Sequence, residues 1–585
     1  MKKIFKYLKP YWFGVAMMVV FVAVQSVGQL LLPDFTSSLI RYGIKVDGGI
    51  DLPVILKYGL YMIGITLISG LAMIIISYFS SKVSTSFGRD IRKDIFKKVS
   101  NFSLAESEKF GTSTLITRST NDVNQVQMHT IMSFRMILSI PILMIGGIIL
   151  SLQKSVRLTS VLLVGIPALI TLVVVTFILV MPLFKVMQKK IDKLTVVGRE
   201  AINGVRVIRA FGQGEKEVKR FKVANDDLTD NNLKAGRIMS LLNPFVNLIF
   251  NVVVLGVVFL AYTIIQSANG SNPNYDDLAN LYAVIQYVNM IMFSIIMLTI
   301  TFINYPRAEV SGKRISEVLD TPISVIDAES DEYKDFFFKG EISFDHVDFK
   351  YQDAEKNVLE DITFKAKPGE TVAIIGSTGS GKSTVINLIP RLFDATNGSV
   401  TIDGINVKDI KLNKLRSLIG FVPQSATLFT GTIAENISYG KDEASIEEIS
   451  EAAKIAQAAD FVDALPEKYD ALVDQGGVNF SGGQKQRISI ARAIVRRPLI
   501  YIFDDSFSAL DFKTDAVLRK NLKSITKKST VLIVAQRIGT ILDADRIIVL
   551  QDGKIVGNDT HKNLMKSCDV YREIAFSQLS EEELA

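Results

Sequence analysis

The apolar residues of this chain are concentrated before about residue 305, where they form long uninterrupted segments. A helix needs roughly 20 apolar residues to cross a lipid bilayer, and about six segments reach that length. These segments are 12–33, 53–78, 132–152, 158–183, 242–267 and 279–303. Only residues 153–157 separate the third segment from the fourth, which predicts a tight hairpin.

Basic residues are unevenly distributed over the polar segments between these spans. Segments 82–120 and 186–238 are rich in lysine and arginine, and four lysines precede the first span, whereas 267–277 contains no basic residue. Positively charged loops tend to stay in the cytoplasm. The pattern therefore predicts a multi-pass protein of the cell membrane, with both termini and both long basic segments in the cytoplasm.

The two long basic segments keep a helical spacing with few helix-breaking residues. We expect them to continue the neighbouring spans as long helices that project from the membrane. Glycine and charged residues interrupt the pattern at 101–111 and 211–221, which are the predicted tips of two cytoplasmic hairpins. Such a tip could contact a cytoplasmic domain; the alternative is a solvated connection.

Four polar side chains lie inside the predicted spans, namely Gln25, Gln29, Gln286 and Asn289. Unpaired polar groups are costly at that depth, so these amides should face the interior of the helix bundle. They could line a substrate-accessible cavity, or they could form hydrogen bonds between helices.

From Gly340 onward the chain alternates strand and helix patterns, as a soluble α/β domain does. We predict a membrane domain at 1–320, a linker at 321–339 and the α/β domain at 340–585. The net charge of +6 is too small to indicate nucleic-acid binding, so no nucleic-acid partner is expected. The single cysteine, Cys568, excludes an internal disulfide and fits a reducing compartment.

One stretch of the α/β domain fits the phosphate-binding loop pattern, in which a glycine and four further residues precede Gly-Lys-Ser. Its residues are Gly376, Ser377, Thr378, Gly379, Ser380, Gly381, Lys382 and Ser383, and Thr384, which follows directly, is a further candidate ATP-binding residue. An apolar run precedes the loop and another follows it, so a strand–loop–helix context is present. The glycines let backbone N–H groups surround phosphates, Lys382 can reach the outer phosphates, and the Ser383 hydroxyl can hold Mg²⁺.

A second phosphate-binding stretch opens another predicted helix, and its residues are Ser481, Gly482, Gly483 and Gln484. Asp504 follows the apolar strand 499–503, where a carboxylate can position Mg²⁺. Tyr351 ends a strand-like run; it could stack on adenine or be an ordinary strand aromatic.

The phosphate loop, Gln424, the 481–484 signature, Asp504 and the run 508–511 resemble, in order and spacing, ATP-binding cassette (ABC) transporters. Six spans with long cytoplasmic hairpins, followed by one cassette, look like a half-transporter of the exporter type. The resemblance covers essentially the whole chain. It implies an α-helical six-span transmembrane domain of the type I/IV exporter fold, followed by an α/β P-loop nucleotide-binding domain.

In that family two cassettes meet head to tail, and each ATP lies between the phosphate loop of one and the signature of the other. The resemblance therefore implies a dimer in which residues 481–484 act on the partner's ATP. It also makes Tyr351 the adenine-stacking residue, Gln424 a ligand of Mg²⁺ with Ser383 and Asp504, and Asp511 the D-loop residue. The hairpin tips become coupling helices, with the second reaching the partner's cassette.

Two positions depart from the family pattern. The family usually has a glutamate directly after the Mg²⁺ aspartate, to orient the attacking water, and this chain has Asp505. The family also usually has a histidine at the γ-phosphate, and this chain has Gln536. Glutamine forms hydrogen bonds but cannot carry a proton.

With these two departures, the chain resembles the degenerate-site subunit of heterodimeric bacterial multidrug exporters. The prediction is an ATP-driven exporter of amphipathic compounds in which this chain binds ATP and Mg²⁺ but hydrolyses ATP slowly. Its partner, a second half-transporter, would then carry the turnover. The alternatives are a lipid or peptide exporter, or an ATP-gated channel or membrane regulator.

Overall fold

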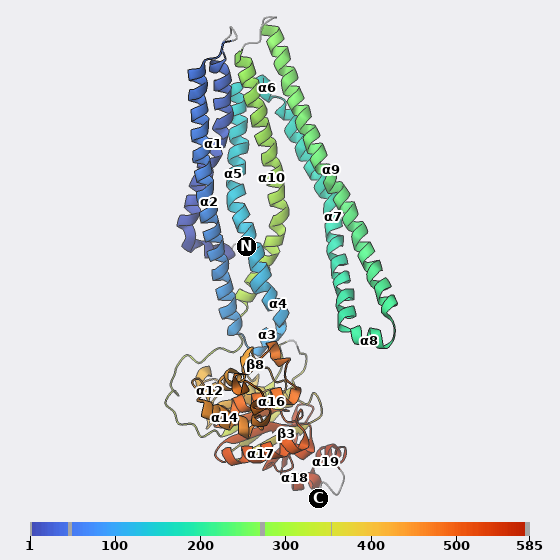
Figure 1. Cartoon of the computed structure of the whole chain (residues 1–585). Helices are drawn as coiled ribbons and strands as arrows, with labels where there is room; N and C mark the ends of the chain where they lie inside the picture. The colour runs from blue at the N-terminus through green and yellow to red at the C-terminus, as the bar shows by residue number, and fades with distance from the viewer. Residues whose placement is uncertain (1–2, 45–48, 269–274, 353, 580–585) are drawn as a thin grey trace. The chain divides into compact units, whose positions relative to one another are not determined.

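A computed structural model of the protein describes residues 3–44, 49–268, 275–352 and 354–579 (Figure 1). The chain divides into two compact units. Unit 1 comprises Met1–Lys98 and Ser113–Asp320, and unit 2 comprises Val99–Thr112 and Thr321–Ala585.

Unit 1 is helical. Its elements are η1 (Ile4–Tyr11), α1 (Trp12–Gly43), α2 (Leu52–Ser100), α4 (Thr112–Thr117), the π-helical turn η2 (Arg118–Asp122), α5 (Val123–Lys154), α6 (Val156–Thr159), α7 (Leu162–Asn203), α8 (Val205–Ala210), α9 (Gly214–Ala268) and α10 (Tyr275–Asp320). Within the described residues, six helices are long and apolar enough to cross a membrane, by length and composition. They coincide with the six predicted spans, which confirms the predicted fold class of this part.

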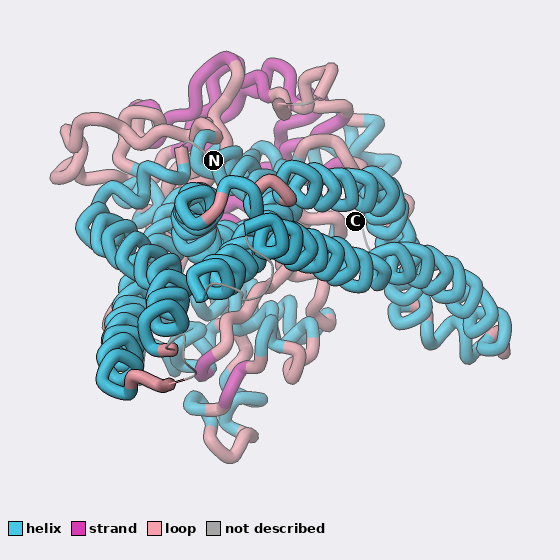
Figure 2. Tube along the Cα trace, turned by 90° about the horizontal axis from the view of Figure 1, so that it is seen from above, coloured by secondary structure: helices cyan, strands magenta, loops and turns pink. Residues whose placement is uncertain are grey.

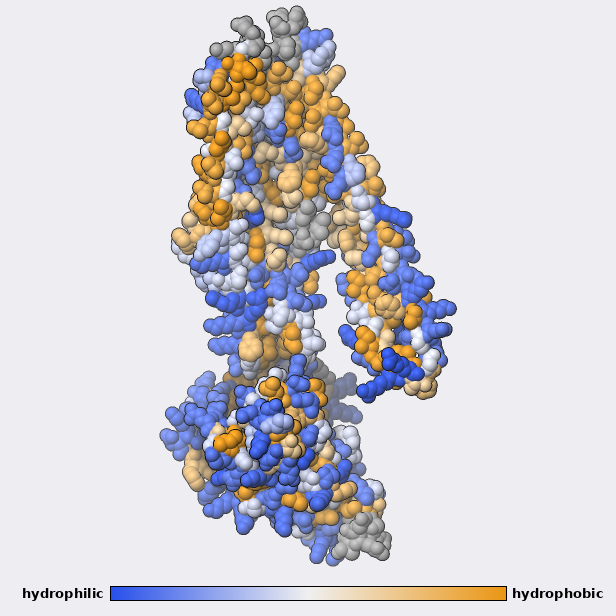
Figure 3. Space-filling view, in the orientation of Figure 1, coloured by the Kyte–Doolittle hydropathy of each residue, from blue (hydrophilic) through white to orange (hydrophobic). Residues whose placement is uncertain are grey.

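The long helices expose apolar side chains over part of their length and hydrophilic ones over the rest. In Figure 3 the apolar surface of unit 1 lies over the helices near α6, and the hydrophilic surface lies toward α8. Leu163 and Val164, for example, are exposed although both are large and apolar. Such a surface is stable in contact with lipid rather than water.

The helices of unit 1 separate into two groups at one end. Helix α5 packs against α10 and α1, whereas α7 packs against α9. Near α6 a shared apolar core joins α7, α9 and α10, with Leu162, Val253 and Val288 among its buried members. Toward α8 the α7–α9 hairpin diverges from the other helices (Figures 1 and 2), and α8 has no buried residue.

The second hairpin tip lies earlier in the chain than predicted. Residues 211–221 were expected to form it, but α9 already begins at Gly214, and the short helix α8 precedes the turn. Gly204 separates α7 from α8, and Gly212 has a φ of 64°, a left-handed conformation that glycine adopts without strain. Glu215 and Glu217 interrupt no helix because acidic residues stabilise the first turn of α9.

The first tip belongs to unit 2. Helix α3 (Leu104–Phe110) begins with a capping box between Ser103 and Glu106. Ser103 Oγ lies 2.8 Å from Ser324 Oγ, and the Ser324 N–H donates to Glu106 Oε1 at 3.1 Å. Leu104 packs against an apolar core of the α/β domain. Within unit 2, the first tip therefore lies against the α/β domain.

Unit 2 contains two principal sheets. The antiparallel sheet has the order β2-β1-β4-β5, and the larger sheet has the order β12-β11-β3-β10-β9-β6. All neighbours in the larger sheet are parallel except β12 and β11. The strands are β1 (Ile342–Phe349), β2 (Leu359–Ala366), β3 (Thr371–Gly376), β4 (Asn397–Ile402), β5 (Ile405–Asn406), β6 (Ile419–Val422), β7 (Gly431–Thr432), β8 (Leu472–Val473), β9 (Ile500–Asp504), β10 (Thr530–Val534), β11 (Arg546–Gln551) and β12 (Lys554–Asp559).

Short helices surround the sheets. They are α11 (Lys382–Leu388), α12 (Leu412–Ser417), α13 (Ile433–Ser438), α14 (Ile446–Ile455), α15 (Ala459–Asp463), η3 (Lys468–Asp470), η4 (Gln475–Gly477), α16 (Gly482–Val495), α17 (Phe512–Ile525), η5 (Ile538–Thr540), α18 (His561–Ser567) and α19 (Asp569–Phe576). The α/β fold predicted for this part is confirmed.

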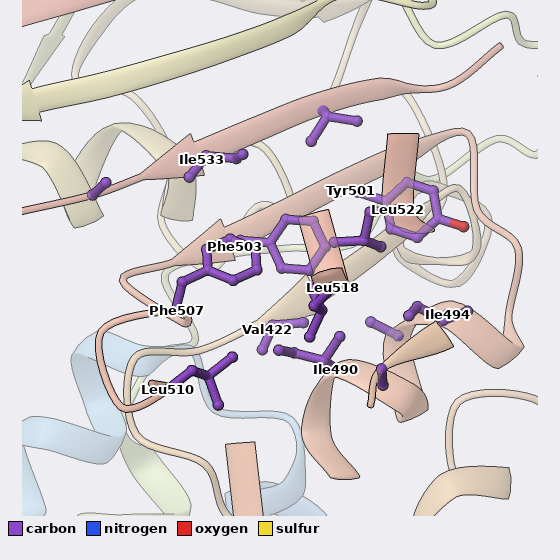
Figure 4. Close-up of a cluster of buried hydrophobic side chains, with 14 of the residues drawn as sticks. Val422, Ile490, Ile494, Tyr501, Phe503, Phe507, Leu510, Leu518, Leu522 and Ile533 are labelled. Carbon is purple, nitrogen blue, oxygen red and sulfur yellow. The ribbon is translucent and has the colours of Figure 1, made fainter. Parts of the chain in front are cut away.

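The larger sheet is buried on both faces, as parallel strands between helices are. Along β9, Ile500 and Ile502 face one apolar core, whereas Tyr501 and Phe503 face the other. Figure 4 shows Phe503 beside Leu518 of α17 in the second core. The central strands β3, β10 and β9 are therefore fixed in register, and their carboxyl ends lie side by side at one edge.

Candidate ATP-binding site

The phosphate loop connects the end of β3 to the start of α11. Gly379 and Gly381 have φ values of 85° and 98°, which a side chain would disfavour. A Cβ on Gly376 would lie 2.2 Å from the Leu550 carbonyl oxygen. Glycine is thus favoured at 379 and 381 by the left-handed backbone conformation, and it is required at 376 by close packing against Leu550.

Lys382 curls over this loop. Its ammonium group donates to the Gly376 and Ser377 carbonyl oxygens at 2.9 and 2.7 Å. Burial lowers the pKa of Lys382, and the carboxylates of Asp505 and Asp504 oppose that shift. A nearby anionic ligand would give this buried cation a stronger partner than two carbonyl oxygens.

Ser383 and Asp504 meet although they are far apart in the sequence. The Ser383 hydroxyl donates to Asp504 Oδ1 at 3.0 Å, because β9 and the phosphate loop end at the same edge of the sheet. Asp505 follows with a φ of 46°, a left-handed conformation in which aspartate is tolerated better than most residues. Its N–H donates to the Val534 carbonyl oxygen at 2.9 Å, which anchors it to β10.

The two adjacent carboxylates are held where their charge is disfavoured. Burial raises the pKa of Asp504, the Ser383 hydrogen bond opposes this, and the charge of Asp505 raises it further. Burial also raises the pKa of Asp505, and a hydrogen bond from Gln424 Nε2 at 3.3 Å opposes that shift. A cation between these groups would favour both ionised forms.

Most of the predicted residues line one cavity of about 380 Å³. The predicted residues among its lining are Tyr351, Thr378, Gly379, Gly381, Lys382, Ser383, Thr384, Gln424, Asp504, Asp505 and Gln536. Val358 and Val534 also line it, and sequence reasoning missed them because an ordinary valine carries no motif. The Tyr351 hydroxyl lies 3.2 Å from Thr384 Oγ1, and its ring packs edge-on against Phe349 and Phe393.

The donor set fits a nucleotide with Mg²⁺. Ser380 Oγ is buried and has no hydrogen-bond partner among the described residues, which leaves a polar atom in the loop for a ligand. Mg²⁺ is usually held by one or two protein oxygens together with substrate phosphates and water. Ser383 and Asp504, with the Gln424 side-chain oxygen, would supply such oxygens beside the phosphate loop.

The signature residues lie elsewhere on the domain. Ser481 caps α16: its hydroxyl accepts from the Gln484 N–H at 3.3 Å, and its own N–H donates to Gln484 Oε1 at 2.9 Å. Ser481 and Gly482 are exposed, and none of residues 481–484 lines the cavity. Asp511 is also exposed and caps α17 through the Thr514 N–H at 3.0 Å.

Comparison with known proteins identifies both units. Residues 15–292 match the ABC transporter transmembrane region, and residues 359–508 match the ABC transporter family of ATP-binding domains. An uncharacterized ABC transporter ATP-binding protein of Mycobacterium tuberculosis is 38% identical over 98% of this chain and 97% of its own length. The uncharacterized ABC transporter ATP-binding protein YfiB of Bacillus subtilis is 38% identical over 100% of this chain and 99% of its own length.

A solved structure of a bacterial Atm1-family ABC exporter with ATP bound has the same fold. It matches with a TM-score of 0.79 at 24% identity, over 98% of this chain and 100% of the other. The six membrane helices, the ATP-binding domain and these relatives together show that the chain is a multi-pass membrane protein that binds ATP and belongs to the ABC transporter family.

Proposed function

We propose that this chain is the degenerate-site subunit of a heterodimeric ATP-driven exporter of amphipathic compounds. The observation that carries the proposal is the cavity at the ends of β3, β9 and β10. Most of the residues predicted to bind ATP line it, but Asp505 and Gln536 stand where the family usually has glutamate and histidine. ATP and Mg²⁺ would bind there and be hydrolysed slowly.

Asp505 is poorly suited to orient water. Aspartate is one methylene shorter than glutamate, which withdraws the carboxylate by roughly 1.5 Å. A misplacement of about 1 Å can lower a rate on the order of a hundredfold. The backbone cannot easily move to compensate, because the Asp505 N–H is bonded to β10 and its carbonyl oxygen accepts from Ser508 Oγ at 2.8 Å.

The signature supports a role in the partner's site. Residues 481–484 form a complete capping box at the start of α16 but lie outside the chain's own ATP cavity. We infer that they complete the site built by the partner's phosphate loop, that Asp511 contributes there as the D-loop residue, and that the second tip contacts the partner's cassette. Fast turnover would occur at the partner's site.

The membrane domain would carry the substrate. Gln25, Gln29 and Gln286 are partly buried, and Asn289 is exposed on the surface of the single chain. These amides on α1 and α10 support a path for compounds with both polar and apolar parts. The basic segments support an orientation with both termini and the ATP-binding domain in the cytoplasm.

The decisive experiment compares ATP turnover by this chain alone and with its partner. Purified alone, the chain should hydrolyse little ATP. In the assembled transporter Lys382→Ala should leave partial turnover, whereas replacing the partner's catalytic glutamate should abolish it. Equal losses from both changes, or brisk turnover by the chain alone, would show two equivalent sites and refute the proposal. Dye accumulation in inverted vesicles separates an exporter from a channel, because a channel cannot concentrate the dye.

A further inference from the structure

One surface contact joins the residue after Asp511 to the residue after Gln536. The Arg537 guanidinium lies over the Phe512 ring, 5.6 Å from its centroid. Phe512 is 80% exposed, so its ring is not part of the apolar core of its own domain. The contact therefore connects two loops on the surface rather than filling the interior.

A third residue fixes the backbone on both sides of Arg537. Gln578, just after α19, donates from Nε2 to the Gln536 carbonyl oxygen at 2.8 Å. Its Oε1 accepts from the Ile538 N–H, also at 2.8 Å. A single side chain thus holds residues 536–538 as one unit. Any displacement of Gln536 is then shared by Arg537.

The charge of Arg537 reaches both loops. Burial raises the pKa of Asp505 in the ATP cavity and of Asp515 in the first turn of α17, and the charge of Arg537 opposes that rise at both. Asp515 also receives a hydrogen bond from Arg519 Nε at 3.1 Å. The guanidinium therefore interacts with one carboxyl group in the ATP cavity and with another in the helix that Asp511 caps.

We propose that Phe512, Arg537 and Gln578 are positioning residues that couple ATP occupancy in this chain's own site to turnover in the partner's site. The inference rests on the proposed function, in which Gln536 faces the chain's own ATP and Asp511 faces the partner's. Within one chain, Phe512 and Arg537 join these two loops directly. We call the three residues the 512–537–578 bridge.

The coupling follows from the contacts. A γ-phosphate that bonds Gln536 fixes residues 536–538, because Gln578 ties them together. Arg537 then holds the Phe512 ring, and with it the start of α17 and Asp511. Without ATP in the chain's own site, the loop that contains Asp511 loses this restraint, and the partner's site is less often complete.

A double-mutant cycle on the full-length assembled transporter tests the Phe512–Arg537 step. Two quantities are measured: retention of a photoreactive ATP analogue on this chain, and steady-state ATP turnover, which reports the partner's site. An exposed cation–π contact changes an equilibrium about two- to fivefold. Phe512→Leu and Arg537→Gln should each lower both quantities by about that factor.

The double variant should be no worse than either single variant, because the contact is already lost in each. Phe512→Tyr keeps an aromatic face and should restore both quantities, which a loss of apolar volume alone would not predict. Additive effects, or an effect on only one of the two quantities, would overturn the bridge.

Gln578 is tested with graded variants and a matched control. Gln578→Glu keeps an acceptor for the Ile538 N–H but places an oxygen against the Gln536 carbonyl, and Gln578→Ala removes both bonds. Both should shorten ATP retention on this chain and reduce turnover. Gln551→Ala, at the exposed last residue of β11, should change neither. If the Gln578 variants match this control, Gln578 has no part in the bridge.

The bridge and the proposed function fail in different ways. Equal losses of turnover from Lys382→Ala and from replacement of the partner's catalytic glutamate would refute the degenerate site, whatever the double-mutant cycle gives. Unequal losses together with additive effects of Phe512→Leu and Arg537→Gln would leave the degenerate site standing and overturn the bridge alone.

Discussion

At the scale of single residues, the two positions that depart from the family pattern share one cavity but are held differently. Asp505 is half-buried, left-handed in its backbone and bonded to β10. Gln536 is exposed, and its carbonyl oxygen is held by Gln578. A longer acid at 505 would extend into the cavity from a fixed backbone, and a histidine at 536 would occupy a place that already faces the cavity.

Restoring both side chains should therefore restore catalysis. In a transporter whose partner lacks its catalytic glutamate, Asp505→Glu should raise ATP turnover by on the order of a hundredfold, because it returns the carboxylate by about one bond length. Adding Gln536→His should raise it further. Asp505→Asn, which keeps the length but removes the base, should give no gain. A double variant as slow as the parent would show that other residues limit this site.

Glu106 carries a stability prediction at the same scale. Burial alone would raise its pKa, but hydrogen bonds from Ser103 and Ser324 outweigh burial and lower it. A lowered pKa means that the carboxylate stabilises the fold above its unfolded pKa and loses that effect as pH falls through the folded value. Glu106→Gln should cost about 1 kcal/mol near pH 7, as loss of a helix cap does.

The cost of Glu106→Gln should shrink as the pH is lowered toward 4. Thermal unfolding of the full chain in detergent across this range measures it. Glu108→Gln, on an exposed side chain of the same helix, is the matched control and should have little effect. A pH-independent cost would mean that shape rather than charge stabilises this cap.

At the scale of elements, the phosphate loop shows why a strict spacing is needed between β3 and α11. Gly379 and Gly381 are both left-handed, but they differ in the space around them. A Cβ on Gly381 would lie 2.6 Å from Leu359 Cδ2, whereas a Cβ on Gly379 meets nothing within 4 Å. The two glycines share the backbone requirement, and only one has a packing requirement as well.

Gly381→Ala should therefore be the more damaging of two matched changes. Gly379→Ala adds backbone strain of about 1–2 kcal/mol, and Gly381→Ala adds a steric clash to that strain. Chemical unfolding of the full chain should rank Gly381→Ala below Gly379→Ala in stability, and ATP binding should weaken in both. The reverse ranking would mean that the loop moves to accommodate the methyl group at 381.

Sequence patterns predicted these elements unequally. The spans and the phosphate loop were predictable because apolar length and glycine spacing are local requirements. The second tip was placed too late, because Glu215 and Glu217 look like a break but stabilise the start of α9. The packing of Leu104 against the α/β core, and the meeting of Ser383 with Asp504, depend on tertiary contacts that no local pattern encodes.

The same limit explains what was missed in the site. Val358, directly before β2, and Val534, at the end of β10, line the ATP cavity only because the fold brings them there. Gln578 is 42 residues away from Gln536 in the sequence. Its role could not be inferred from its neighbours in the chain.

At the scale of the whole molecule, the membrane topology can be tested by labelling cysteines introduced on either side of the membrane. The single native cysteine, Cys568, is buried. Val223→Cys, in the basic part of α9 and outside the second tip, should react with a membrane-impermeant maleimide in inverted vesicles but not in intact cells. Val156→Cys, between α5 and α7, should show the opposite. Both positions are exposed, at 61% and 69%, so access to the reagent rather than burial decides the result. Labelling of Val223→Cys in intact cells would reverse the proposed orientation.

The divergence of the α7–α9 hairpin has a consequence for how the cell handles this protein. Its far end displays Ile202, Val207 and Phe211, which are 76%, 60% and 74% exposed. Exposed apolar groups of this kind are recognised by chaperones and proteases when no partner covers them. An orphan copy should therefore be short-lived. A pulse-chase measurement should find a shorter half-life without the partner, and Phe211→Ser should lengthen it. Balanced synthesis of two subunits would then be enforced by degradation of the one in excess.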